Sequence, residues 1–105
     1  MGGSDGPPRQ SSGAEVALCS ELTFNATVNS PKPTVLKALN TGLILELSVT
    51  PGNTSIEVRY KNLSVGALTG NRIVRLIACI QSGFEFVAEV VSLADGHCVV
   101  RVREK

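Results

Sequence analysis

The stretch LILELSVTPGNTSIEVRY, residues 43–60, decides the fold of this chain. Apolar residues alternate with polar ones on both sides of Pro51-Gly52, which is typical of two half-buried strands joined by a turn. We expect a hairpin centred on that turn, and its register pairs Leu47 with Ile56, Leu45 with Val58 and Leu43 with Tyr60. All of these side chains then lie on one face, as a core-facing hairpin requires.

The same register places Glu46 directly opposite Glu57 on the other face. Paired carboxylates are used in acid/base chemistry or in metal binding. We interpret this pair instead as part of a solvated outer face. No further ligand or nucleophile is evident nearby, and Arg59 is a diagonal neighbour that offsets the repulsion.

Upstream of the hairpin, the sequence predicts one strand and one short helix. Residues 22–28 form the strand, and Ser30-Pro31-Lys32-Pro33 ends it. Residues 34–39 then predict a short helical turn, which Asn40 and Gly42 terminate.

Downstream, residues 63–68 predict a strand, and Gly66 inside it indicates a bulge or a close backbone approach. A helix is expected over residues 72–81, with Gly83 as its stop. Its apolar positions recur at helical spacing, as Ile73, Leu76, Ile77 and Ile80. A second, partly solvated stripe of this helix carries Arg72, Arg75 and Cys79.

The last two strands, residues 84–93 and 97–103, are expected to meet at the turn dipeptide Asp95-Gly96. Near this turn both faces of the pair are apolar. One face is predicted to carry Val91, Leu93, Cys98 and Val100, and the other Val90 and Val99. A strand pair that is apolar on both faces is either sandwiched or part of an interface.

Together these elements predict an α+β, β-rich fold: a small, partly open β-barrel of about six strands with one main helix and one short helix. Residues 1–20, rich in glycine and proline at their start, predict a disordered N-terminal tail, and residues 21–105 a single domain. The chain has 105 residues and a net charge of +1. From Leu22 onward nine Lys and Arg stand against six Asp and Glu, a net charge of +3.

No run approaches the roughly 20 apolar residues of a membrane span, so we expect a cytoplasmic protein with no membrane partner. Three cysteines, Cys19, Cys79 and Cys98, leave at least one unpaired, and we expect all three to be buried or half-buried thiols. Three N-x-S/T sequons begin at Asn25, Asn53 and Asn62. Because no apolar signal region precedes them, we expect them to remain unglycosylated.

Several short motifs give residues 22–105 a resemblance to the HIRAN domain family. An apolar strand is followed by Leu39-Asn40-Thr41-Gly42, similar to the family's "L-x-x-G". Asn53-Thr54-Ser55-Ile56-Glu57-Val58 resembles its "N-A-I-x-V" with one residue more. Val65-Gly66-Ala67-Leu68 resembles "VG-x-L", a helix follows, and residues 83–90 resemble "G-x-x-F-x-A-x-V".

The resemblance implies a small β-barrel with one or two helices, and some members of the family bind DNA ends and single-stranded DNA. Binding there relies on a Tyr-Asp pair before "N-A-I-x-V" and on basic and aromatic residues in a pocket. This chain has Pro51-Gly52 in place of that pair, so only Asn53 is carried over.

We therefore expect a non-enzymatic binding module for single-stranded nucleic acid or DNA ends. Its expected contacts are Arg59, Lys61, Arg72 and Arg75, brought together if the Lys61-Asn62 turn packs beside the helix start, with Asn53 added by the resemblance. The alternative is a protein-interaction or homodimerisation module that uses the apolar C-terminal hairpin. We expect no enzyme, cofactor or metal site, because the sequence has no Ser-His-Asp set, phosphate-cradling glycine loop or His/Cys cluster.

Overall fold

The structure is a computed structural model that describes residues 18–105. Its strands are β1 (Phe24–Thr27), β2 (Ile44–Val49), β3 (Ile56–Tyr60), β4 (Leu63–Leu68), β5 (Phe86–Ser92) and β6 (Val99–Glu104). Its helices are α2 (Pro33–Leu36), α3 (Asn71–Gln81) and the single 3₁₀ turn η1 (Ala94–Gly96), and residues 18–20 form a further helical turn. No helix within residues 18–105 is long and apolar enough to cross a membrane.

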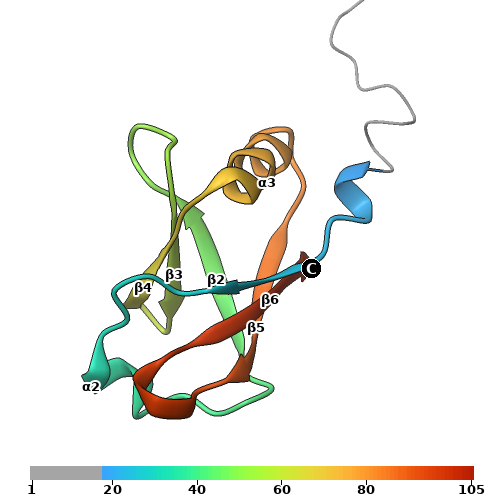
Figure 1. The fold of residues 1–105 in the computed structure, drawn as a ribbon. Coiled ribbons are helices and arrows are strands. Elements are labelled where there is room, and N and C mark those ends of the chain that lie inside the picture. Colours follow the sequence, from blue (N-terminus) through green and yellow to red (C-terminus); the bar gives the residue numbers. More distant parts are fainter. Residues whose placement is uncertain (1–17) are drawn as a thin grey trace, which may run out of the picture.

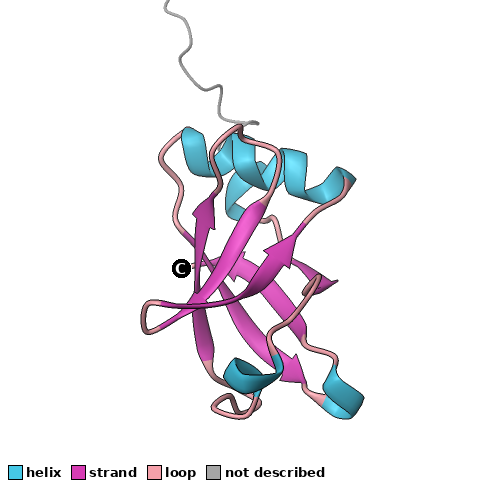
Figure 2. Cartoon of the chain, turned by 90° about the vertical axis from the view of Figure 1, so that its left-hand side faces the viewer, coloured by secondary structure: helices cyan, strands magenta, loops and turns pink. Residues whose placement is uncertain are grey.

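All six strands belong to one sheet, in the order β1-β6-β5-β2-β3-β4, and every neighbouring pair is antiparallel. The sheet curls so that its two outer strands approach each other, and an isolated bridge between Asn29 and Ala67 links them (Figure 1). Helix α3 covers one end of the curled sheet, while α2 and η1 lie at the other (Figure 2). The predicted β-rich, partly open barrel with one main and one short helix is confirmed.

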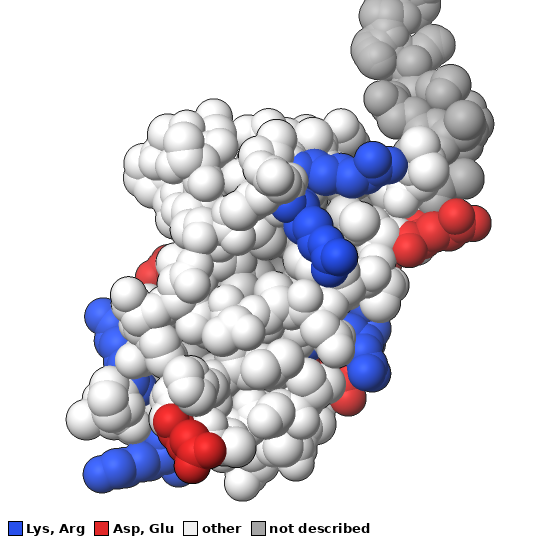
Figure 3. Space-filling model, in the orientation of Figure 1, with Lys and Arg blue, Asp and Glu red and all other residues white. Residues whose placement is uncertain are grey.

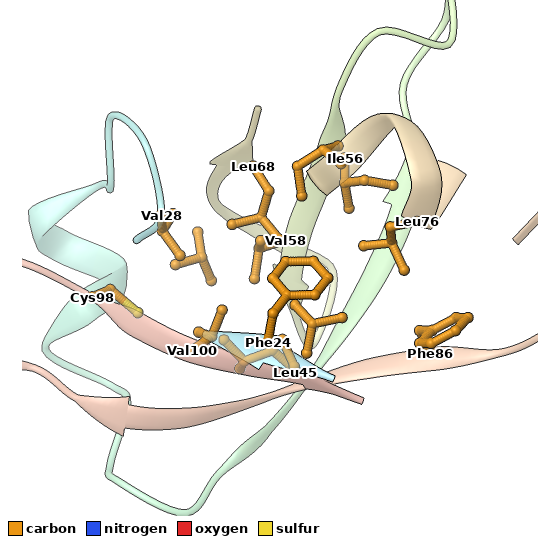
Figure 4. Close-up of a cluster of buried hydrophobic side chains, with 14 of the residues drawn as sticks. Phe24, Val28, Leu45, Ile56, Val58, Leu68, Leu76, Phe86, Cys98 and Val100 are labelled. Atoms are coloured by element: carbon orange, nitrogen blue, oxygen red, sulfur yellow. The ribbon is translucent and has the colours of Figure 1, made fainter. Parts of the chain in front are cut away.

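The core fills the inside of this curl with aliphatic side chains. Leu45, Ile56 and Val58 have no exposed surface, and they meet Leu76 of α3 in the same cluster (Figure 4). Helix α3 contributes Ile73 and Ile77 as well, at the helical spacing that the sequence shows. Removing this apolar surface from water is the main force that holds α3 on the sheet.

The first hairpin has a different register from the predicted one. Leu47 pairs with Val58 and Val49 with Ile56, a shift of two residues. The loop is wider than a Pro51-Gly52 turn, because Thr50 and Ser55 are joined by a backbone hydrogen bond of 3.0 Å and by their hydroxyl groups. A shift by two keeps every side chain on its predicted face, so the core is unaffected.

This register also separates the two carboxylates that the predicted hairpin brought together. Glu46 lies opposite Arg59, and Glu57 lies opposite Ser48. The guanidinium of Arg59 is 3.0 Å from the Glu57 carboxylate. The acid pair is therefore replaced by an ordinary surface arrangement of opposite charges.

The predicted faces of the C-terminal hairpin were also partly wrong. Val90 pairs with Val100 in the core, and a register shift between Val90 and Ser92 moves Val91 out of line with them. The Asp95-Gly96 turn forms, but β5 ends at Ser92 and β6 begins at Val99, so the strands are joined by six residues rather than two. Asp95 and Gly96 both have positive φ, and the His97 N–H donates to the Ala94 carbonyl.

The cysteine prediction was wrong for two of the three residues. Cys19 and Cys79 form a disulfide with a Cα–Cα distance of 5.7 Å, whereas Cys98 is a free, buried thiol. Cys79 was expected on a partly solvated stripe of the helix, but the turn at residues 18–20 packs over it. Of the predicted tail, residues 1–17 lie outside the described residues, and residues 18–20 are bonded to the domain through Cys19.

Candidate binding groove at the barrel seam

The two outer strands of the sheet meet at a seam where backbone hydrogen bonds join them and buried side chains such as Val28 and Val65 pack on the inner side. The N–H groups of Asn29 and Lys32 donate to the carbonyls of Ala67 and Val65, and the Ala67 N–H donates back to Asn29. Gly66 permits this approach, because a Cβ there would be 2.5 Å from Val28 Cγ1 and 2.7 Å from the Asn29 carbonyl oxygen. The close approach predicted from Gly66 is confirmed, and the β3–β4 ladder also shifts register between Val58 and Arg59.

Two hollows lie along this seam, and both are lined by Asn29 and Thr69. The Asn29 side-chain amide donates to the Thr69 hydroxyl at 2.6 Å, which fixes both side chains between the hollows. We call the pair of hollows the seam groove. The rest of its lining comes from Phe24, Asn25, Ala26, Thr27, Asn71, Arg72 and Ile73 on the helix side, and from Ser30, Lys32, Thr50, Pro51, Glu57, Ser64, Gly66 and Ala67 on the strand side.

The helix-side hollow has a volume of about 330 Å³ and carries an unbalanced positive charge. Arg72 is its charged lining residue, and the side chains of Asn25, Asn71 and Thr69 add amide and hydroxyl groups. The Arg72 guanidinium lies over the Phe24 ring, 5.8 Å from its centre. This cation–π contact holds the guanidinium beside another lining residue of the hollow. The hollow therefore suits an anionic group that also accepts hydrogen bonds.

The strand-side hollow is larger, about 600 Å³, but its charges balance. Lys32 and Glu57 both line it. The pKa of Glu57 is lowered from its ordinary value, chiefly by the hydrogen bond from Arg59 and then by that from Ser64, with burial acting in the opposite direction. Glu57 is thus held as a carboxylate, and it weakens the attraction of this hollow for anions.

The structure divides the predicted contact residues between the two ends of the barrel. Strand β4 pairs Leu63 with Tyr60 at one end and Leu68 with Ile56 at the other. The turn that holds Lys61 is therefore separated from the start of α3 by the length of β4, roughly 17 Å at 3.3 Å per residue. The expected packing of this turn beside the helix start was wrong.

Arg72 and Arg75 lie one turn apart on α3, and the loop that holds Asn53 ends at the same end of the barrel. Arg59 is used within its own hairpin, because it pairs with Glu57 and donates to the Asn62 carbonyl. Lys61 lies over the Tyr60 ring at 5.3 Å. Figure 3 shows the Lys and Arg side chains of one face in separate groups with uncharged surface between them.

Among the described residues no aromatic ring is fully exposed, and the partly exposed Tyr60 and Phe84 do not line the seam groove. Phe24 and Phe86 are buried, and Tyr60 and Phe84 are packed against the core. Base–aromatic stacking needs an exposed ring. A ligand of the seam groove would therefore be held by charge and hydrogen bonds.

Sequence reasoning identified Arg72 in this groove but missed its other polar residues. Asn29 and Thr69 belong to short connections between elements, Asn71 is the first residue of α3, and only the closing of the barrel brings Asn29 to the other two. The signal that was available is Gly66, whose close approach marks the place where the two outer strands meet.

Comparison with known proteins agrees with the fold and adds no function. No protein-family model matches this chain, and no curated protein matches it. The fold is similar to the crystal structure of a protein from Lactobacillus plantarum, a structural-genomics target. The TM-score is 0.68 at 16% sequence identity, and the match covers 76% of this chain and 89% of that chain. A likeness at this identity shows the fold alone.

Proposed function

We propose that this domain is a non-enzymatic binding module that holds a single strand of nucleic acid at the helix side of the seam groove. The observation that carries the proposal is the unbalanced charge of Arg72 in a hollow lined by amides and hydroxyls. Phosphate oxygens accept hydrogen bonds from all of these groups. The resemblance of residues 22–105 to the HIRAN family supports the same ligand class.

Arg75 extends the positive surface by one helical turn, and the Asn53 loop lies at the same end of the barrel. Each phosphate contact on a single strand contributes about −0.7 to the slope of log K against the logarithm of the salt concentration, so two contacts give a slope of about −1.4. Binding is expected to be weak and independent of base sequence, because no exposed aromatic ring is found in the described part of the chain.

Fluorescence anisotropy with a labelled single-stranded DNA at low salt tests the proposal. The double variant Arg72→Gln/Arg75→Gln should lose binding and flatten the salt dependence. The matched control is Lys37→Gln/Lys61→Gln, which removes the same charge from exposed residues that do not line the groove. No binding by the wild type at high micromolar protein, or equal losses in the two double variants, would overturn it.

A protein-interaction or homodimerisation module is the second candidate. Ile44 on the outer face of β2 is 44% exposed, and Val91 of the neighbouring strand is its diagonal, half-exposed neighbour. Two copies that pack this face together would cover it. Sedimentation equilibrium checks the proposal, because Ile44→Lys should dissociate a dimer of the wild type. A wild type that is strictly monomeric at 100 μM, roughly the concentration at which a weak dimer forms, would exclude self-association.

The compartment decides which nucleic acid such a module meets. The cytoplasmic setting expected from the sequence stays a prediction. The disulfide between Cys19 and Cys79 weighs against it, because structural disulfides are rare in reducing compartments.

A further inference from the structure

The three sequons of this chain are all displayed on the surface of the fold. Asn25 lies on β1, Asn53 in the loop between β2 and β3, and Asn62 in the turn between β3 and β4. The three asparagines are exposed. An N-x-S/T sequence accepts an N-linked glycan only where it reaches the surface, so the fold meets this first requirement at each position.

Asn53 and Asn62 have the geometry of acceptor sites. Both lie at turns with positive φ, 59° and 71°, which directs their side chains away from the sheet. In the described part of the chain, no hydrogen bond involves either side-chain amide, whereas the amide of Asn29 is bonded to Thr69. Each amide nitrogen therefore faces solvent.

Local structure accounts for both polar residues of each of these two sequons. Asparagine tolerates the left-handed region, and that alone suits it to a tight turn. The hydroxyl two residues later also has a partner in the fold, because Ser55 bonds to the Thr50 hydroxyl and Ser64 bonds to the Glu57 carboxylate. Asn29 and Asn40 are exposed asparagines that lack this hydroxyl, because Pro31 and Gly42 occupy the third position.

The disulfide is an independent observation that points to the same compartment. Cys19 and Cys79 are 60 residues apart in sequence and both are buried, so this bond ties two segments of the fold together. Their Cα–Cα distance of 5.7 Å is within the usual range for a disulfide. Structural disulfides form and persist in the secretory pathway, which is also where sequons are glycosylated.

We propose that this chain folds in the oxidising secretory pathway and carries N-linked glycans on Asn53 and Asn62. The two acceptors lie at opposite ends of β3, so the glycans flank the outer face of this strand. Asn25 is left out of the proposal, because its side chain lines the helix-side hollow and a glycan there would fill the groove. Leaving out Asn25 rests on the proposed function of the groove, whereas the assignment of Asn53 and Asn62 does not.

Peptide mass spectrometry of the full chain, purified from the cells that make it, tests the proposal directly. Enzymatic release of N-glycans converts each modified asparagine to aspartate, and Asp is expected at positions 53 and 62. A digest without reductant should contain the peptides of Cys19 and Cys79 as one linked species. Unmodified asparagine at both positions, or alkylation of both cysteines before reduction, would overturn it.

Secretion of the full chain from eukaryotic cells behind a cleavable leader tests the assignment of the acceptors. Asn53→Gln and Asn62→Gln should each increase the electrophoretic mobility by one glycan step. Asn29→Gln is the matched control, an exposed asparagine outside any sequon, and should leave the mobility unchanged. A secreted wild type that migrates like the Asn53→Gln/Asn62→Gln double variant would contradict the assignment.

Discussion

The continuous side of the barrel and its seam are built in different ways. Strands β5 and β6 pair along a long ladder with one register shift near its end, and Ala88, Val90, Val100 and Val102 have at most 1% of their surface exposed there. Where β1 approaches β4, a single bridge joins Asn29 to Ala67, Val28 and Val65 are buried on the inner side, and mostly polar side chains line the outer hollows. The first side is held by a long strand ladder and packing, and the second by packing, a few backbone hydrogen bonds and the close approach at Gly66.

This difference separates stability from the candidate site. The core of the fold is apolar on both sides, and no buried polar residue is found among residues 18–105. The outer surface of the seam carries exposed polar side chains, so it can present amides, hydroxyls and Arg72 to a ligand. Substitutions in the two regions should therefore differ in size and in what they change.

The largest effect is expected on the continuous side. Leu45→Ala removes a side chain with no exposed surface, and should lower the free energy of unfolding by about 4 kcal/mol. The matched control is Leu63→Ala on β4, where the side chain is 50% exposed and the loss should be below about 1 kcal/mol. Urea denaturation measures both. Equal losses would show that the burial of Leu45 does not set its contribution to stability.

The disulfide anchors the chain just before β1, on the seam side of the barrel. Cys19→Ser/Cys79→Ser should lower the free energy of unfolding by about 3 kcal/mol, because the bond constrains a long segment of the unfolded chain. Denaturation of the wild type with and without reductant gives a second measure, and the reduced wild type should match the double variant. A wild type whose free energy of unfolding is the same with and without reductant would contradict this expectation.

Closure of the seam depends on Gly66. Gly66→Ala introduces a Cβ only 2.5 Å from Val28 Cγ1, and should cost about 2 kcal/mol through overpacking. Hydrogen exchange localises the damage: the Ala67 amide, bonded to Asn29, should exchange faster than in the wild type. The Val90 amide, bonded to Leu43 on the continuous side, serves as the internal control and should keep more of its protection. A uniform change at both amides would mean that the seam does not open separately.

The sequence predicted best what depends on local periodicity. The spacing of Ile73, Leu76 and Ile77 identified α3, and the alternation in residues 63–68 identified β4 within its observed bounds. The prediction from sequence failed where two hairpin registers have the same alternation of apolar and polar residues. A hairpin shifted by two residues has the same faces, so alternation could not show that Thr50 and Ser55 close a wider loop.

The features that depend on long-range contacts could not be predicted from the sequence, for a different reason. Nothing local marks Cys19 and Cys79 as partners across 60 residues, and an odd cysteine count argued against a pair. The seam groove combines Asn29, Thr69 and Arg72 from separate parts of the chain. Predicting it requires knowing which strands become the edges of the sheet, and the order β1-β6-β5-β2-β3-β4 follows from long-range pairing.

The smallest expected effect is the pH dependence of the seam, at Glu57 on its strand side. Hydrogen bonds from Arg59 and Ser64 hold the Glu57 pKa below its ordinary value, so the folded state favours the carboxylate. The contribution to stability is therefore complete above the unfolded pKa of about 4.3, and is lost as the pH falls through the lower folded pKa. Glu57→Gln should lower the melting temperature slightly at pH 7, and the two curves should converge at acidic pH.

Glu85→Gln is the matched control for this titration, because its carboxylate is 77% exposed and 3.9 Å from Lys105. It should leave the difference between acidic and neutral pH nearly unchanged. Scanning calorimetry of wild type and both variants between acidic and neutral pH measures the effect. A Glu57→Gln curve that runs parallel to the wild type at every pH would mean that the Arg59 contact contributes nothing to folding. Convergence would place a pH-dependent contact at the seam, whereas the aliphatic packing around Leu45 on the continuous side has no group to titrate.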